Sequence, residues 1–143
     1  RSGECLPYED NRVSLQPDKT DRFGMPLMRF DVTFRDNEMR MMDDARTEGE
    51  QMLRAAGLLN VTSSRSEHVP GDAIHEMGGA RMGADPRESV LNKWSQAHDA
   101  ANLFVTDGAQ MASIACVNPS LTFMALTARA ADHAVKQMEA GVI

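Results

Sequence analysis

Alternation of apolar and polar residues predicts two strands near the start of the chain. Residues 12–16 alternate, with Val13 and Leu15 on one face. A longer segment places four apolar side chains on one face, and these are Met28, Phe30, Val32 and Phe34. Turn-forming residues at 17–21 separate the segments, and so short a link favours an antiparallel pair. Such a sheet packs its apolar face on a core, while its polar face meets solvent or a ligand.

A helical period follows the second strand. Asp36 or Asn37 can cap a helix that runs to about Ala56 and ends at Gly57. One face of this helix carries Met42, Ala45, Gly49, Met52 and Ala56. A methionine-rich face can be a pliable binding surface, but core filler is the simpler interpretation. Residues 60–72 are polar and irregular.

The last part of the chain predicts one strand and one helix. Residues 102–106 are typical of a short buried strand that runs into Asp107 and Gly108. A helix then begins with Asn118 as its N-cap and Pro119 as its first helical residue, and it ends at Gly141. Its apolar stripe consists of Leu121, Met124, Ala128, Ala131, Val135 and Met138.

Composition narrows the class of protein. The 143 residues are 42% hydrophobic and 25% charged, as in an ordinary globular domain, and no apolar run is long enough to span a membrane. The net charge of −6 argues against a nucleic-acid partner. Cys5 and Cys116 allow at most one disulfide, and two free thiols are the simpler expectation. The chain starts at Arg1 without Met, which is expected of a processed product or of a piece of a longer protein, and the motifs described below favour a piece.

Several common catalytic motifs are missing. His75 is not followed by a histidine at position 79, so the zinc-protease motif is absent, and no metal site is expected. No Gly-x-Ser-x-Gly elbow occurs. No two glycines lie two positions apart, which excludes the dinucleotide fingerprint Gly-x-Gly-x-x-Gly. If a nucleotide cofactor is involved, its main phosphate-binding turn lies outside this chain.

Two segments nevertheless suggest a site. The first, residues 75–83, opens with His75 and contains three glycines, which permit tight turns or close approach to a flat group. The second begins at Asn118, where a helix N-terminus suits a group that becomes negative. Each has an ordinary alternative, because turn-rich loops with a structural histidine and polar N-caps are both common.

Other candidate residues have simpler explanations. His98 with Asp99 is similar to a metal-dependent phosphohydrolase pair, but a lone dipeptide is more often a surface loop. His68 lies in a polar loop, and His133 lies late in the final helix, where a cation is favourable. Trp94 is the single tryptophan; it could stack on a sugar, but packing under a loop is the simpler interpretation.

Taken in order, the blocks from His75 to Asp132 resemble the C-terminal signature of the glucose-methanol-choline (GMC) family of FAD-dependent oxidoreductases. The blocks are His75…Gly78-Gly79…Arg81-Met82-Gly83, Phe104-Val105-Thr106-Asp107-Gly108, Asn118-Pro119-Ser120-Leu121-Thr122 and Thr127-Ala128-Arg129-Ala130-Ala131-Asp132. The family usually has Thr where this chain has Gly79. Segments 6–13 and 24–26 resemble its substrate-domain strands more loosely. Within the family, Ser89-Val90-Leu91-Asn92 and His98-Asp99 are similar to bacterial glucoside 3-dehydrogenases and gluconate-dehydrogenase-like members.

The resemblance implies an α+β fold in two parts. Residues 1–75 would be an antiparallel sheet fragment of a substrate-binding domain with a flanking helix. Residues 76–143 would supply the closing strand and C-terminal helix of a flavin-binding domain. The rest of the FAD site would come from an N-terminal region missing from this chain, which would be inactive alone. Apolar surface left by such a division suggests an oligomer or a companion subunit.

The resemblance also implies a reaction and its residues. An alcohol group, of a sugar or glycoside, would be oxidised to a carbonyl by hydride transfer to flavin. His75 would be the base, since imidazole accepts protons near neutral pH and a positioned base accelerates such steps by ~10²–10⁴-fold. Asn118 would hold the substrate oxygen. The cofactor-binding residues would be Asp107 and Gly108 along the ribityl and phosphate region, and Asn118, Pro119 and Leu121 at the flavin edge. The alternative is a non-catalytic binding or assembly module with the same architecture.

Overall fold

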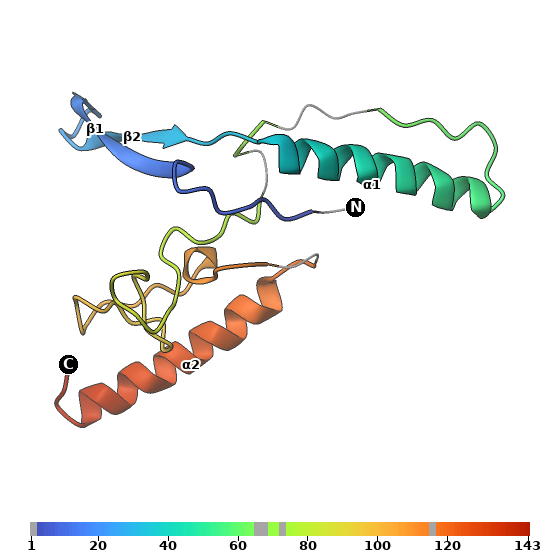
Figure 1. Ribbon diagram of the computed structural model, residues 1–143. Coiled ribbons are helices and arrows are strands. Elements are labelled where there is room, and N and C mark those ends of the chain that lie inside the picture. The colour runs from blue at the N-terminus through green and yellow to red at the C-terminus, as the bar shows by residue number, and fades with distance from the viewer. Residues whose placement is uncertain (1–2, 65–68, 72–73, 115–116) are drawn as a thin grey trace. The chain divides into compact units, whose positions relative to one another are not determined.

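The computed structural model describes residues 3–64, 69–71, 74–114 and 117–143. The chain divides into two compact units, residues 1–73 and residues 74–143. The first contains strands β1 (Arg12–Thr20) and β2 (Pro26–Asp31) and helix α1 (Asp36–Ala55) (Figure 1). The second contains a short 3-10 turn, Gly108–Gln110, and helix α2 (Ser120–Glu139). The predicted mixture of helix and antiparallel sheet is confirmed at this level.

The two strands form an antiparallel hairpin, as the short link predicted. Arg12 pairs with Asp31 and Leu15 with Met28, and the register shifts between Gln16 and Thr20. The turn predicted at 17–21 is misplaced, because β1 continues to Thr20.

The hairpin turn instead uses residues 21–24. The Asp21 carboxylate accepts hydrogen bonds from the backbone N–H groups of Phe23 (2.8 Å) and Met25 (3.0 Å). Gly24 supplies the left-handed conformation, with a φ of +83°. An aspartate that accepts two turn amides and a glycine three residues later therefore determine where the strand reverses.

The apolar face of the hairpin is open. The four side chains on it are Val13, Leu15, Met28 and Phe30, and each is more than half exposed. Val32 and Phe34, predicted to continue the strand, come after β2 ends at Asp31. Among the described residues, the expectation that this face packs on a core is therefore not met.

Helix α1 begins and ends through local hydrogen bonds. Its N-cap is Arg35 rather than Asp36 or Asn37, because the Glu38 carboxylate accepts the Arg35 backbone N–H at 2.9 Å. Gly57, at a φ of +84°, ends the helix as predicted, and its N–H donates to the Arg54 carbonyl at 2.9 Å.

The interior of α1 differs from its predicted apolar face. In α1, all of which is described, the one buried residue is Glu38, at 1% exposure. Met42, Ala45 and Gly49 are half-buried, whereas Met52 is 60% exposed. The predicted core filler is therefore only partly covered in this chain.

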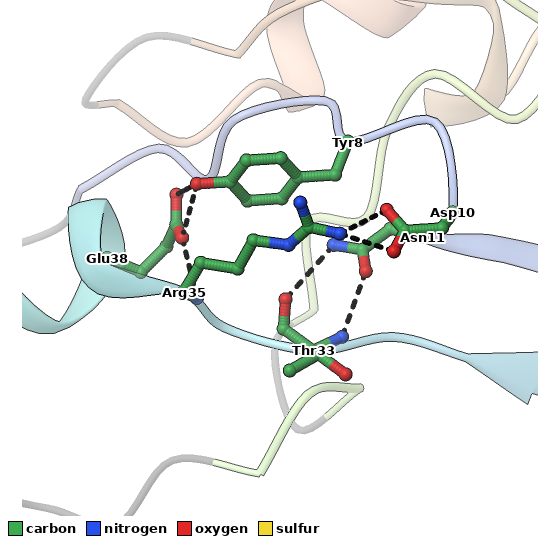
Figure 2. Close-up of polar contacts among 6 residues, drawn as sticks. All are labelled: Tyr8, Asp10, Asn11, Thr33, Arg35 and Glu38. Atoms are coloured by element: carbon green, nitrogen blue, oxygen red, sulfur yellow. Dashed lines mark hydrogen bonds and ion pairs between the residues drawn. The ribbon is translucent and has the colours of Figure 1, made fainter.

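Hydrogen bonds to the Glu38 carboxylate join the N-terminal segment to α1 (Figure 2). Glu38 accepts hydrogen bonds from the Leu6 backbone N–H (3.1 Å), the Tyr8 hydroxyl (3.0 Å) and the Asn37 amide (3.1 Å). Burial raises the pKa of Glu38, but hydrogen bonds from Arg35, Leu6, Asn37 and Tyr8 outweigh it and lower the pKa to about 2. Glu38 therefore acts here as an ionised acceptor.

Two further contacts complete this junction (Figure 2). The Arg35 guanidinium lies 4.2 Å from the centre of the Tyr8 ring and pairs with the Asp10 carboxylate. The Asn11 side chain accepts the Thr33 N–H at 2.9 Å and donates to the Thr33 carbonyl at 3.3 Å. Hydrogen bonds and ion pairs therefore hold the N-terminal segment to α1, whereas the sequence pattern predicted apolar packing for the first unit.

The second unit has no regular strand among its described residues. Its loops are joined by isolated bridges, Met82 with Leu91, Leu91 with Ala97 and Gln96 with Phe104. Leu91, fully buried, is the centre of this arrangement. The strand predicted at 102–106 is wrong for this chain, because a single bridge at Phe104 is the extent of its pairing.

Helix α2 has two apolar sides. Ala130 is buried and Phe123, Leu126 and Ala134 are half-buried, so this side packs on the loops of the same unit. The predicted stripe lies on the other side and is exposed, with Leu121 at 78% and Met124 at 68%. At 100° per residue, Leu121 lies on the opposite side of the helix from Ala130, so the two sets occupy different faces. The predicted stripe is therefore not the core of this chain.

Other expectations have simple outcomes. Cys5 is exposed and free, while Cys116 and His68 lie outside the described residues. Among the helices described, none combines the length and apolarity needed to cross a membrane.

Candidate functional site

His75 and Asn118 meet in the second unit. The His75 Nε2 atom lies 3.0 Å from the Asn118 Oδ1 atom, although 43 positions separate the residues. His75 is half-buried in the glycine-rich loop, and Asn118 is exposed just before α2. The structure thus brings together the two residues that the sequence singled out as a catalytic pair.

Either residue can be the donor in this hydrogen bond. A neutral imidazole has one N–H donor and one acceptor nitrogen, and a carboxamide carries both a donor and an acceptor. With Oδ1 facing Nε2, the imidazole donates; with the amide turned over, its NH₂ group donates to Nε2. The same 3.0 Å contact therefore accommodates Nε2 with or without its proton.

Backbone pairing holds the His75 loop against the turn at 107–110. The Ala80 N–H donates to the Ala109 carbonyl at 3.0 Å, and the Met82 N–H donates to the Gln110 carbonyl at 2.8 Å. Gly78 adopts a φ of +85°, a conformation that favours glycine. Main-chain contacts therefore hold the loop in place, in addition to the side-chain contacts of His75 and Met82.

Asp107 and Gly108 have roles within the chain. The exposed Asp107 carboxylate accepts the Ala109 N–H at 2.9 Å and so caps the 3-10 turn. A Cβ atom on Gly108 would lie 2.8 Å from the Glu76 carbonyl oxygen and 3.2 Å from the Phe123 ring. These contacts explain both residue types without a cofactor.

We expect Gly108→Ala to disturb the loop that carries His75. The added methyl group would meet the Glu76 backbone oxygen closer than van der Waals contact allows, so the loop must shift. Overpacking of this kind costs about 1–3 kcal/mol. Urea unfolding followed by Trp94 fluorescence measures the loss, with Gly79→Ala of the same unit as control because the nearest atom to a Cβ at that position lies 3.9 Å away. Equal effects of the two substitutions would contradict this packing argument.

The start of α2 offers N–H donors that have no partner within the helix. The helix begins at Ser120 after an N-cap at Pro119, one residue later than predicted, and no side chain caps it. Its first turn carries no acidic residue. Pro119 is buried and has no N–H group, so the free donors belong to the residues that follow it, including the exposed Leu121. This end of α2 fits an anionic group such as the edge of a reduced flavin.

A buried polar pair supports this region and was not predicted. Ser95 and Gln110 are both fully buried, and the Ser95 hydroxyl donates to the Gln110 Oε1 atom at 2.6 Å. The Gln110 carbonyl also accepts the Met82 N–H, so this residue joins two loops. No periodic pattern marks a buried glutamine in a three-residue turn. Within the described residues, no group of three or more histidine, cysteine or acidic side chains could hold a metal ion.

Comparison with known proteins places the chain in a family. A family model described as GMC oxidoreductase matches residues 7–127. The 2-methyl-1,2-propanediol dehydrogenase of Mycolicibacterium austroafricanum is 37% identical over 139 residues, which cover 92% of this chain and 24% of that protein. The fructose dehydrogenase large subunit of Gluconobacter japonicus is 35% identical over 138 residues, covering 96% of this chain and 25% of that protein.

A third relative is named as an oxidase rather than a dehydrogenase. The paromamine 6'-oxidase of Streptomyces fradiae is 34% identical over 125 residues, which cover 87% of this chain and 23% of that protein. The chain thus spans about a quarter of the length of each of these relatives. The match over residues 7–127 and the identity to full-length oxidoreductases confirm the predicted resemblance: the chain belongs to the GMC oxidoreductase family.

Proposed function

We propose that this chain is the C-terminal part of an FAD-dependent oxidoreductase that oxidises an alcohol group of a sugar or glycoside to a carbonyl. His75 is the base, and Asn118 holds the substrate oxygen. The observation that carries this proposal is the 3.0 Å contact between His75 Nε2 and Asn118 Oδ1, which comes from residues distant in the sequence. Family membership supports the reaction class.

The reaction requires a place for one proton. Oxidation of a carbinol breaks the O–H and C–H bonds and forms the C=O double bond. His75 takes the hydroxyl proton at an imidazole nitrogen, and the electron pair left on oxygen helps to expel the hydride. When bound, the flavin of FAD accepts that hydride with its two electrons.

Asn118 suits both stages of proton transfer. Before transfer, its NH₂ group can donate to an unprotonated Nε2 atom or to the substrate oxygen. After transfer, its Oδ1 atom can accept from the protonated Nε2 atom at the same position. An amide cannot take the proton itself, so the base role rests on His75.

The start of α2 is the part of this chain that best fits FAD. The uncapped N–H groups after Pro119, near Leu121, would face the flavin edge, where negative charge collects on reduction. Asp107 and Gly108 would lie along the ribityl and phosphate region. The adenine and pyrophosphate half would be held by an N-terminal region outside this chain.

Two of the relatives support the substrate class, and one of them supports a companion subunit. One is named for fructose and another for paromamine, whereas the 2-methyl-1,2-propanediol dehydrogenase is named for a small diol. The fructose dehydrogenase relative is named as a large subunit. We therefore include a companion subunit in the proposal, and it is one candidate to cover the exposed face of α2.

Asn118→Asp tests the pair through pH. A carboxylate beside His75 stabilises the charged imidazolium, so the unprotonated base is present only at higher pH. In the flavin-loaded enzyme we expect kcat/KM for a sugar alcohol to fall at neutral pH, with the acid limb of its pH profile moved to higher pH. Asn102→Asp, at an exposed position, is the control. A variant with an unmoved profile would remove Asn118 from contact with the base.

A further inference from the structure

A groove separate from His75 and Asn118 runs along one side of the second unit. It encloses about 580 Å³, within the range of small-molecule sites. Its walls include Met82, Asn92, Lys93, Trp94, His98 and Arg129. None of the residues assigned above to catalysis or flavin binding lines it.

Trp94 is held rigidly at the edge of this groove. The Asn92 side chain accepts the Trp94 N–H at 2.8 Å, and the Asn92 carbonyl accepts the Ser95 N–H at 3.1 Å, which closes a tight turn. The indole ring stacks on His133 of α2, with the ring centres 4.6 Å apart and the planes 11° apart. One wall of the groove is therefore preorganised by both a turn and a helix.

Two cations converge on the same ring. Lys93 Nζ lies 5.2 Å and the Arg129 guanidinium carbon 5.8 Å from the centre of the Trp94 ring. Neither has an acidic partner among the described residues, whereas Arg87 and Lys136 of the same unit pair with Asp85 and Asp132. In a chain with a net charge of −6, this is a local excess of positive charge.

His98 contributes a polar wall rather than a catalytic base. The Ser89 hydroxyl donates its one proton to the Asp85 carbonyl at 2.7 Å. The contact between Ser89 Oγ and His98 Nε2, at 3.1 Å, must then have the imidazole as donor. A serine whose proton is already given to a carbonyl is not activated as a nucleophile by this histidine, so the groove is better suited to binding than to hydrolysis.

We propose that the Trp94 groove binds a small organic anion, a carboxylate or phosphate on a compact apolar body. The anionic group would lie between Lys93 and Arg129, where the guanidinium can make two parallel hydrogen bonds to carboxylate or phosphate oxygens. The apolar body would contact Met82 and the edge of Trp94. None of the residues proposed to contact flavin or the alcohol substrate lines this groove.

Trp94 is also the probe of the proposal, because it is the only tryptophan in the chain. We would titrate the 143-residue chain with phenyl phosphate, benzoate, inorganic phosphate and benzyl alcohol at constant ionic strength, and follow Trp94 fluorescence. The test variant is Lys93→Gln with Arg129→Gln. The matched control is Arg87→Gln with Lys136→Gln, which removes the same charge from cations that already have partners.

The expected results are specific. Phenyl phosphate, benzoate or both give a saturable change, inorganic phosphate binds more weakly, and benzyl alcohol gives none up to ~10 mM. The Lys93 and Arg129 double variant raises the Kd at least ~10-fold, a loss of about 1.4 kcal/mol, while the control pair changes it less than ~2-fold. Comparison of phenyl phosphate with benzoate decides which anionic group the site prefers.

Other outcomes overturn the proposal. These are no saturable response to any anion, an equal response to benzyl alcohol, or an equal loss in both double variants. The reciprocal exchange Lys93→Arg with Arg129→Lys preserves charge, and it should retain binding; circular dichroism confirms that each variant is folded. Because no flavin is involved, failure here leaves the proposed oxidoreductase activity untouched.

Discussion

Replacement of His75 by alanine is expected to slow the reduction of bound flavin by an alcohol substrate by ~10²–10⁴-fold. The variant has no group at this position that can take the hydroxyl proton, so the hydride must leave a neutral alcohol. Asn118, 3.0 Å from the imidazole, cannot substitute, because an amide is not a base. Stopped-flow absorbance of the flavin under anaerobic conditions, in the flavin-loaded enzyme, measures this step directly.

The control for this experiment is flavin content. His75→Ala should leave flavin bound, because the proposed contacts at the start of α2 do not involve the imidazole. His75→Gln, which keeps a hydrogen-bonding side chain but no basic nitrogen, should be nearly as slow as alanine. Rates of reduction close to wild type in either variant would remove His75 from the mechanism, whereas loss of flavin would indicate a structural role.

The two helices show what a periodic pattern can predict. Both exist near their predicted bounds, and Gly57 and Gly141 both have the left-handed conformation at the helix ends. A glycine in that conformation ends a helix through local hydrogen bonds. Local sequence is therefore enough to predict such an end.

The N-cap residues were harder to predict from the sequence, because a polar side chain can hydrogen-bond to groups other than the helix N-terminus. Asn118 was predicted to cap α2, but its amide oxygen lies beside His75 instead. The helix accordingly begins at Ser120 with no side-chain cap. Periodicity cannot foresee a partner 43 positions away, whereas the resemblance to known proteins did bring the two residues together.

The predictions of a strand at 102–106 and of a buried stripe on α2 were wrong for a different reason. Residues 102–106 have the composition of a buried strand, but a strand also needs a neighbouring strand to pair with, and Phe104 makes only one isolated bridge. Similarly, Leu121 and Met124 are apolar on a face that this chain leaves open. A pattern reports which residues require burial, and it does not report which polypeptide covers them.

Glu38 is a buried residue that no sequence pattern marked. Between Asn37 and Met39, in a helix rich in acidic residues, it has the pattern of a solvated side chain. Instead it is 1% exposed and accepts hydrogen bonds from Leu6, Tyr8 and Arg35. Ionised carboxylates are rarely buried unless they are fully hydrogen-bonded, so only the tertiary contacts could show this position.

Glu38→Gln is expected to destabilise the first unit by about 2–4 kcal/mol at neutral pH. Glutamine keeps one acceptor oxygen and places an NH₂ group where the other accepts a hydrogen bond, so either the Leu6 or the Arg35 backbone N–H loses its partner and faces a second donor. Asp44→Asn, an exposed charge removal on the same helix, should change stability by less than about 0.5 kcal/mol. Tyr8, the only tyrosine, reports on this unit, and Trp94 reports on the other.

The pH dependence of the unfolding free energy distinguishes the effect of the Glu38 charge from the effect of its side-chain packing. The pKa of Glu38 is about 2 in the folded chain, below its ordinary value of 4.5, so the folded state favours the ionised form. A difference of this size corresponds to about 3 kcal/mol, present above pH 4.5 and lost as the pH falls through 2. Wild-type stability should therefore fall over this range, and the gap to Glu38→Gln should close with it. A gap that stays constant from neutral pH down to the acid limit would show that packing, and not the charge on Glu38, holds the N-terminal segment to α1.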